Sequence, residues 1–248
     1  MEKVGKVYLI GAGPGDPELI TVKAARILAS IDVVLYDRLV GDGVLGLINP
    51  EAEKIYVGKH EGQQEEAQQM IFDLLVRHAK SGKTVARLKS GDPTIFGRAA
   101  EEWELLLQNG IAVEVVPGVP SAIAGAELAG VPLTARGYSH GFAVITGHDV
   151  PDLPEHLGRY AKAETLVILM GVKRRTIIAE VLIACGRSPQ EPIMFVERAS
   201  TPRERVFTAT LADVAAGQVA VTPPAIFVIG AVVALRQVLR PSADGDVF

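Results

Sequence analysis

The chain alternates short stretches of β-branched and other apolar residues with longer stretches of helical periodicity. The clearest helix is predicted over residues 64–80, where apolar side chains recur three or four residues apart and His78 lies on the apolar stripe as a packed residue. Strands are predicted at residues 6–10, 33–36, 54–57, 84–88 and 113–116. Because strands that alternate with helices form crossover units, this order favours an α/β fold with a mainly parallel sheet.

A second series of predicted strands follows the segment PGVP. Its members are residues 142–146, 166–169, 193–196, 206–210 and 226–229. The last of them follow one another with little helix between, so we expect a mixed sheet here. The chain is therefore predicted to form two α/β domains, residues 1–116 and 117–248, joined near residues 115–121.

Composition narrows the classes of partner. The chain has 248 residues, 48% of them hydrophobic, and 25 Lys and Arg against 29 Asp and Glu give a net charge of −4. This balance provides no broad basic field for nucleic acid or an anionic membrane, so an anionic ligand needs a local cluster of cations. The single Cys185 excludes an internal disulfide and a Cys-based zinc site, and we expect no bound metal.

The sequence also predicts no targeting signal. The start MEKVGKVYLI lacks the apolar core of a signal peptide, and the longest apolar run, residues 225–235, is too short to span a bilayer. Together with the single cysteine, this predicts a soluble cytoplasmic protein without a membrane partner.

The glycine-rich turn GAGPGDP follows the first predicted strand. Gly11 and Gly13 fit a dinucleotide fingerprint, but Asp16 takes the place of its third glycine. Pro14 and Pro17 each remove an N–H group that a phosphate cradle would use, and no Gly-Lys-Ser/Thr follows. The other interpretation is a tight turn into a capped helix, with Asp16 as N-cap and Pro17 at the first helical position.

Five loops occupy equivalent positions in the chain, directly after predicted strands. GAGPGDP, DRLV, SGDP, PGVPS and TGHD all follow predicted strands. In open α/β sheets, ligands bind beyond the carboxyl ends of the strands. If the two domains turn these edges toward each other, the loops line one cleft.

Arg98 is the most informative single residue. It stands in the first turn of a helix predicted over residues 97–108, where a cation opposes the macrodipole at a cost of about 0.3–1 kcal/mol. One interpretation is that Arg98 pairs with Glu101 or Glu102. The other is that Arg98 faces an anion in the cleft.

Four further charged residues stand near the predicted loops. Asp37 closes the second strand, where it could cap a helix, bind a ribose as in dinucleotide enzymes, or act as a general base. Lys59 follows the third strand and has a functional interpretation only if it shares the cleft with Asp37. Arg136 and His148 are either surface or capping residues or members of a cationic cluster.

The motifs taken together carry a resemblance. GAGPGDPELIT, DVVLYDRLV, YVGK, RLKSGDPTIFGR, VEVVPGVPSAIAGAELAGVPLTARGYS and TGH, in this order and spacing, closely resemble the tetrapyrrole methylase family over residues 5–236. Gly-Asp-Pro and Pro-Gly corners recur across that family. DRLV, VGK and IFGR point to its branch that acts on uroporphyrinogen.

The resemblance implies that S-adenosylmethionine binds, folded up, in a cleft between two α/β domains, that S-adenosylhomocysteine is the product, and that the protein is a homodimer. It also implies a set of cofactor contacts on the loops. These would be Pro14, Ser90, Gly91, Asp92, Ile95, Pro120, Ser121, Met170 and Ala199.

The implied reaction transfers two methyl groups to carbons of uroporphyrinogen III, a small-molecule tetrapyrrole, giving precorrin-2 for sirohaem or cobalamin biosynthesis. By similarity, Asp37 is a proton acceptor and Lys59 a proton donor. Arg98 is a second candidate to assist deprotonation, but we favour it as a carboxylate anchor because a guanidinium is almost never neutral. The other residues expected to face the substrate are Glu101, Arg136 and His148.

The chain departs from the family pattern at a few positions. Ser90 and Ala99-Ala100 replace glycines, and Pro120 replaces a threonine beside the cofactor. Other interpretations therefore stay open: a methyltransferase for a later precorrin, a non-catalytic tetrapyrrole or nucleoside binding module, or, from GAG and Asp37, a dinucleotide oxidoreductase. A macromolecular substrate is disfavoured, since RNA binders usually combine a basic patch with stacking rings and aromatic residues are 5% here.

Overall fold

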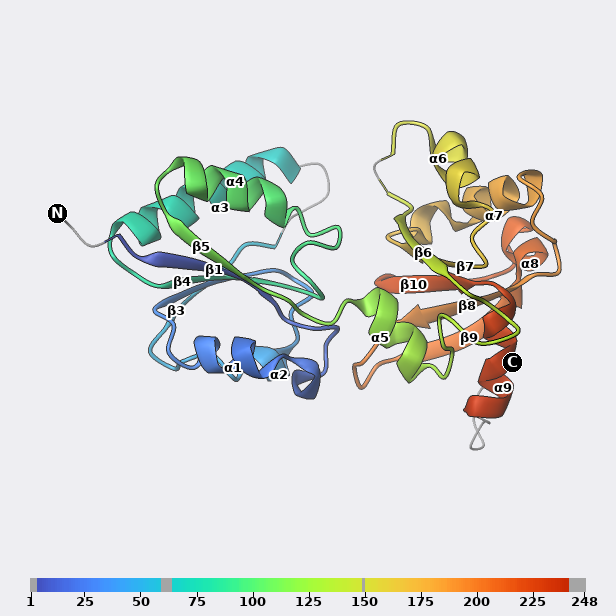
Figure 1. Ribbon diagram of the computed structural model, residues 1–248, viewed down its shortest axis with the longest axis horizontal. Coiled ribbons are helices and arrows are strands. Elements are labelled where there is room, and N and C mark those ends of the chain that lie inside the picture. Colours follow the sequence, from blue (N-terminus) through green and yellow to red (C-terminus); the bar gives the residue numbers. More distant parts are fainter. Residues whose placement is uncertain (1–3, 59–63, 149, 241–248) are drawn as a thin grey trace. The chain divides into compact units, whose positions relative to one another are not determined.

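The computed structural model describes residues 4–58, 64–148 and 150–240. The chain divides into two compact units, Met1–Pro120 and Ser121–Phe248 (Figure 1). No helix in the described ranges is long and apolar enough to cross a membrane.

Unit 1 contains a five-stranded, wholly parallel sheet with the strand order β3-β2-β4-β1-β5. Its strands are β1 (Lys6–Gly11), β2 (Val33–Tyr36), β3 (Glu53–Tyr56), β4 (Val85–Lys89) and β5 (Ala112–Val116). All five strands predicted from the sequence are confirmed to within one residue at each end. Their near-continuous apolar runs are typical of strands that are covered on both faces.

Helices cover both faces of this sheet (Figure 1). On one face lie α1 (Val22–Leu28) and α2 (Asp42–Leu45), and on the other lie α3 (Gln64–Lys80) and α4 (Ala99–Gln108). Alternation along β1 supplies both cores, since Ile10 packs with the α1 side and Leu9 with the α3 side. The predicted helix over residues 64–80 is confirmed, and His78 is buried on it as expected.

The glycine-rich turn leads into a short capped helix. The 3₁₀ helix η1 (Pro17–Leu19) begins with Pro17, and the Asp16 side chain accepts a hydrogen bond from the Glu18 N–H at 2.8 Å. The capped-helix interpretation is therefore confirmed, although the helix is a single 3₁₀ turn and α1 begins separately after its own cap, Thr21.

Unit 2 contains a mixed sheet with the strand order β6-β7-β10-β8-β9, in which only the β6–β7 pair is parallel. Its strands are β6 (Phe142–Thr146), β7 (Thr165–Leu169), β8 (Pro192–Glu197), β9 (Arg205–Thr210) and β10 (Ala225–Ile229). All five predicted strands are present, again to within one residue at each end. Because β10 runs antiparallel to both of its neighbours, β7 and β8 run in the same direction and end at the same edge.

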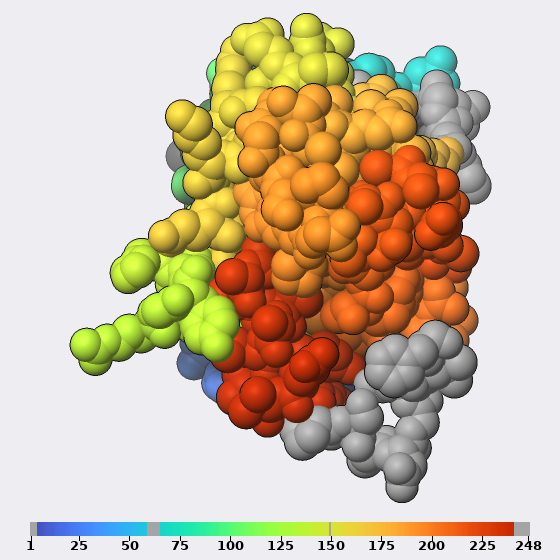
Figure 2. Space-filling view, turned by 90° about the vertical axis from the view of Figure 1, so that its right-hand side faces the viewer, coloured from blue at the N-terminus to red at the C-terminus, as the bar shows by residue number. Residues whose placement is uncertain are grey.

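Helices also cover both faces of the second sheet. One core packs under α6 (Leu153–Tyr160), α7 (Arg175–Ala184) and α8 (Leu211–Ala215), and the other under α5 (Ser121–Leu128) and η3 (Ala231–Leu235). The remaining short helices are η2 (Val172–Arg174) and α9 (Arg236–Leu239). A segment closed by the Ala135–Ser139 bridge stands out from the surface of this unit, lime green in Figure 2.

Candidate functional site

Three glycines pack backbone against backbone at the carboxyl ends of three adjacent strands of unit 1, β4, β1 and β5. Gly11 ends β1, Gly91 follows β4 and Gly118 follows β5. A Cβ atom on Gly118 would lie 2.2 Å from the Gly91 carbonyl oxygen and 2.7 Å from the Gly11 Cα atom. No side chain fits at this junction, so the glycines are explained by the close approach of three turns.

The N–H groups of the first turn are already used by its neighbours. Ala12 N donates to Lys89 O at 2.7 Å, and Gly13 N donates to Gly91 O at 3.2 Å. Gly91 N returns a hydrogen bond to Gly13 O at 2.7 Å. Since Pro14 has no N–H group, this part of the turn offers a pyrophosphate few donors, which argues against the dinucleotide interpretation.

Asp92 ties the second turn to the third. Its Oδ1 accepts hydrogen bonds from Thr94 N at 2.8 Å and Thr94 Oγ1 at 2.6 Å, and its Oδ2 accepts one from Gly118 N at 3.1 Å. The Gly13–Gly91 bridge brings the Pro14 turn against the same loop. The structure therefore places five of the predicted cofactor residues on adjoining turns of unit 1: Pro14, Ser90, Gly91, Asp92 and Ile95.

Asp37 lies directly after β2 and belongs to a buried ionic cluster. Arg87, on β4, donates from Nη2 to Asp37 Oδ1 at 2.6 Å. Its Nε donates to Glu102 Oε1, on α4, at 3.2 Å. Lys89 Nζ and Gln68 Nε2 also donate to Glu102 Oε1, at 2.9 Å and 3.3 Å. We call these five residues the ionic cluster.

Burial and neighbouring charges shift the pKa values of Lys89 and Glu102. Burial lowers the pKa of Lys89, and the neighbouring Arg87 cation lowers it further. Burial also opposes ionisation of Glu102, but the Arg87 and Lys89 cations outweigh this effect and hold the Glu102 pKa below its ordinary value. The buried pair of Glu102 with Arg87 is therefore ionic.

Arg87, Lys89 and Gln68 were not predicted as site residues from the sequence, and Glu102 was expected only as a possible partner of Arg98. The available signal was the segment VARLK, in which Arg87 and Lys89 stand two residues apart inside an apolar strand. That spacing puts both cations on one face of the sheet, where a buried carboxylate must compensate them.

The interpretation that Arg98 pairs with a glutamate is confirmed, and the partner is Glu101. Its Nε and Nη2 atoms donate to Glu101 Oε1 and Oε2 at 2.8 Å and 2.7 Å, and its Nη1 lies 3.2 Å from Glu65 Oε1. These hydrogen bonds, chiefly those of Glu101, raise the pKa of Arg98, so it stays a cation and cannot act as a base.

The prediction that Arg98 lies inside the first turn of a helix is wrong. The helix α4 begins at Ala99, and Arg98 is its N-cap residue in a left-handed conformation with φ of 56°. Phe96, two residues earlier, is left-handed as well, with φ of 54°. Lys59, the other predicted catalytic residue, lies outside the described residues.

Unit 2 has left-handed residues at the ends of two strands. Met170 follows β7 with φ of 58°, and Arg198 and Ser200 follow β8 with φ of 48° and 61°, so that Ala199 stands between them. Such conformations cost roughly 1–3 kcal/mol each and gather at ligand sites. Met170 and Ala199 were both predicted as cofactor contacts, and the sheet brings them to the same edge.

Helix α5 packs against this edge. A Cβ atom on Gly125 would lie 3.2 Å from the Ala199 Cβ atom, so α5, which begins at Ser121, approaches the Ala199 loop closely. Pro120 precedes that helix at the end of unit 1.

The predicted substrate residues of unit 2 are exposed. Arg136 lies in the segment closed by the Ala135–Ser139 bridge. His148 follows β6, where its backbone N–H donates to Thr146 Oγ1 at 3.1 Å. Because β6 is parallel to β7, His148 and Met170 follow strands that end at the same edge.

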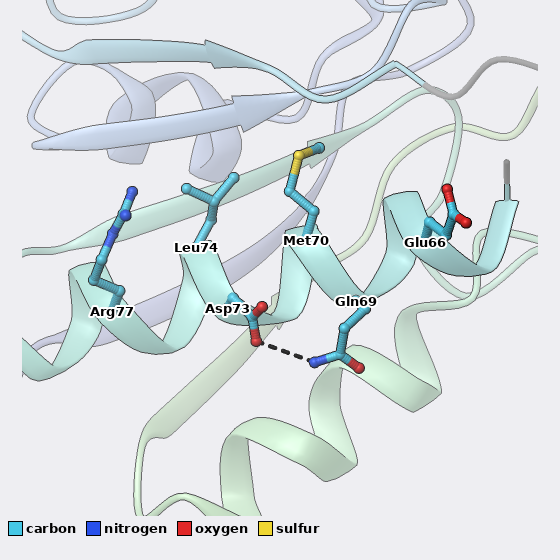
Figure 3. A pocket seen from close by; sticks show the side chains of 6 residues that line it. All are labelled: Glu66, Gln69, Met70, Asp73, Leu74 and Arg77. Atoms are coloured by element: carbon cyan, nitrogen blue, oxygen red, sulfur yellow. Dashed lines mark hydrogen bonds between the residues drawn. The ribbon is translucent and has the colours of Figure 1, made fainter.

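A surface hollow on unit 1 is lined by none of the predicted site residues. Figure 3 shows its lining side chains along a single helix, α3, with Gln69 Nε2 donating to Asp73 Oδ1 at 3.0 Å. The lining residues are Glu66, Gln69, Met70, Asp73, Leu74 and Arg77. Since small-molecule sites draw polar groups from several elements, this hollow is not our candidate site.

Residues 6–215 match the tetrapyrrole (corrin/porphyrin) methylases. The chain belongs to this family. A protein of Methanosarcina barkeri (strain Fusaro) named S-adenosyl-L-methionine-dependent uroporphyrinogen III methyltransferase is 44% identical over 252 residues, covering 98% of each chain. The uroporphyrin-III C-methyl transferase of Thermus thermophilus, crystallised with S-adenyl homocysteine, is 52% identical, with a TM-score of 0.83 over 93% of this chain and 100% of that one.

Longer members of the family are similar as well. A siroheme synthase of Ruthia magnifica subsp. Calyptogena magnifica is 44% identical over 244 residues, which make up 96% of this chain and 51% of that protein. The chain therefore spans about half the length of the siroheme synthases that it matches. The predicted α/β fold with two sheets is confirmed by these relatives and by the structure.

Proposed function

We propose that this tetrapyrrole methylase transfers two methyl groups from S-adenosylmethionine to carbons of uroporphyrinogen III and releases precorrin-2. The observation that carries the proposal is the match to the Methanosarcina methyltransferase, 44% identical over 98% of both chains. A match of this length includes every loop at the strand ends described above. The second candidate, methylation of a later precorrin, has the same chemistry and differs only in the macrocycle.

The loop residues fit S-adenosylmethionine. This ligand carries no phosphate, and the Gly11–Gly91–Gly118 junction has used several of its N–H groups internally. Ile95 and Met170, at strand-end loops of the two units, keep 44% and 49% of their surface exposed. Large apolar side chains that are exposed on loops can pack against the adenine ring and the methionine carbon chain. We propose that the nine predicted contacts hold this cofactor.

When bound, S-adenosylmethionine supplies an electrophilic methyl group on a sulfonium. The chain's own residues orient the macrocycle and manage the proton that leaves it. We assign Asp37 as the proton acceptor because its carboxylate lies at the carboxyl end of β2 with 28% of its side chain exposed. Lys59 is proposed as the proton donor on the strength of the resemblance alone.

A local set of cations is proposed to anchor the substrate. Uroporphyrinogen carries eight carboxylates, and this chain has a net charge of −4, so the anchors must be specific side chains. Arg98 already binds one carboxylate, that of Glu101, through two hydrogen bonds. A substrate carboxylate can take the place of the exposed Glu65 on the same guanidinium. Arg136 and His148 are proposed as further anchors.

Three statements stay predictions: the domain boundary near residues 115–121, the homodimer and the cytoplasmic location. Size-exclusion chromatography with light scattering tests the homodimer directly.

The proposed function is tested by anaerobic incubation of the purified chain with uroporphyrinogen III and S-adenosylmethionine, followed by mass analysis of the macrocycle. A gain of two methyl groups supports the proposal, and Asp37→Ala should slow that gain by about 10²–10⁴-fold. Methylation of a later precorrin in place of uroporphyrinogen III, in a competition between the two substrates, would favour the second candidate.

A further inference from the structure

We infer that Arg87 is a positioning residue that aims the Asp37 carboxylate, and that Glu102 holds Arg87 in turn. The inference rests on the proposed role of Asp37 as proton acceptor. Neither Arg87 nor Glu102 needs to touch the substrate for this role. The hydrogen bonds and the burial of the ionic cluster support this role.

The guanidinium of Arg87 is held on all three of its nitrogen atoms. Nε donates to Glu102 Oε1 at 3.2 Å, and Nη2 donates to Asp37 Oδ1 at 2.6 Å. Nη1 lies 3.3 Å from Leu88 O and 3.5 Å from Leu35 O, so it also bridges the backbones of β4 and β2. Because hydrogen bonds hold this planar group on three sides, it can take only one orientation. A lysine ammonium is a single point of charge and cannot make the same set of hydrogen bonds.

Only Asp37 connects the ionised groups of the cluster to solvent. The side chains of Arg87 and Glu102 are 1% and 0% exposed, and that of Lys89 is 5% exposed, whereas Asp37 is 28% exposed. The cluster therefore presents one carboxylate, that of Asp37, to a reacting group.

The arrangement at the two carboxylates favours a role beyond stability. Arg87 binds one oxygen of Asp37, and no hydrogen bond from the described part of the chain reaches the other, which leaves Oδ2 available to a reacting group. Glu102 concentrates its hydrogen bonds on Oε1, while its buried Oε2 has no partner among the described residues. A cluster that served stability alone would satisfy that oxygen.

The test is a double-mutant cycle of Arg87→Lys and Asp37→Ala in the methylation assay, with Arg159→Lys, an exposed arginine of unit 2, as the matched control. We expect Arg87→Lys to lower kcat by about tenfold or more, because proton transfer by a positioned group contributes about 10²–10⁴-fold. The KM for S-adenosylmethionine should stay unchanged. The double variant should be no slower than Asp37→Ala alone, since Arg87 acts through Asp37.

Independent losses that multiply in the double variant would overturn the inference, as would wild-type kcat in Arg87→Lys. If Arg87→Lys does not fold, Glu102→Asp serves instead, because it withdraws the carboxylate that holds Arg87 and should lower kcat in the same way. Full kcat in a folded Glu102→Asp protein would equally contradict the account.

A structural readout separates this inference from the proposed function. If the wild-type chain does not methylate uroporphyrinogen III, the proposed function fails, and a crystal structure of Arg87→Lys then decides the inference. We expect the Asp37 carboxylate to leave its wild-type orientation or to occupy more than one rotamer. An unchanged, single orientation would show that Arg87 does not position it.

Discussion

Replacing Gly118 with alanine should destabilise the chain and weaken cofactor binding together. The new Cβ atom would lie 2.2 Å from Gly91 O and 2.7 Å from Gly11 Cα, and both atoms belong to backbone that cannot rotate away. The turns after β1 and β4 must therefore move. Overpacking of this kind costs about 1–3 kcal/mol, and each kcal/mol corresponds to about 2–4 °C in a chain of this size, so Tm should fall by about 2–12 °C.

The assay is thermal unfolding followed by circular dichroism, with calorimetric titration of S-adenosylhomocysteine on the same samples. The matched control is Gly141→Ala, because a Cβ atom there has no heavy atom within 4 Å. This control should stay within about 0.5 kcal/mol of the wild type. If Gly118→Ala keeps the wild-type Tm and cofactor affinity, the three turns do not pack as described and the reasoning is refuted.

Three further predictions follow from single groups. Burial lowers the pKa of His78 below 6.5, so the unfolded chain binds its proton first as pH falls. The free energy of unfolding measured in urea should therefore decrease as pH falls below about 6.5. This decrease should be smaller in His78→Gln than in the wild type, and an equal decrease in both proteins would contradict the prediction. Arg98→Ala should raise the KM for uroporphyrinogen III about tenfold and leave that for S-adenosylmethionine unchanged, whereas an unchanged substrate KM would exclude the anchor. Asp92→Ala removes the hydrogen-bond acceptors of Thr94 and Gly118, so calorimetry should find S-adenosylhomocysteine bound about tenfold more weakly. Wild-type affinity would show that the Asp92 hydrogen bonds between these two turns do not matter for cofactor binding.

The strands and the long helix could be predicted because local apolar patterns determine them. β2 and α3 match their predicted ranges, since a buried strand needs a short apolar run and an amphipathic helix needs a 3.6-residue period. The start of α4 was placed two residues early. The left-handed backbone at Arg98 depends on tertiary packing, and helix periodicity contains no information on it.

The candidate site was only partly predictable. The first turn lacks the third glycine of a dinucleotide fingerprint, which weakened that interpretation, but the reason for its glycines, contact with Gly91 and Gly118, appears only in three dimensions. Arg87 and Glu102 were missed because charged side chains are usually exposed. Their burial requires that β2, β4 and α4 come together, which no local pattern encodes.

The most direct test of the account is to supply S-adenosylmethionine labelled with ¹³C in its methyl group and to record the ¹³C spectrum of the macrocycle formed anaerobically from uroporphyrinogen III. The account predicts two labelled methyl groups, each bonded to a ring carbon, and a gain about 10²–10⁴-fold slower with Asp37→Ala. A label on nitrogen or oxygen, or an unlabelled macrocycle with S-adenosylhomocysteine still bound, would contradict it.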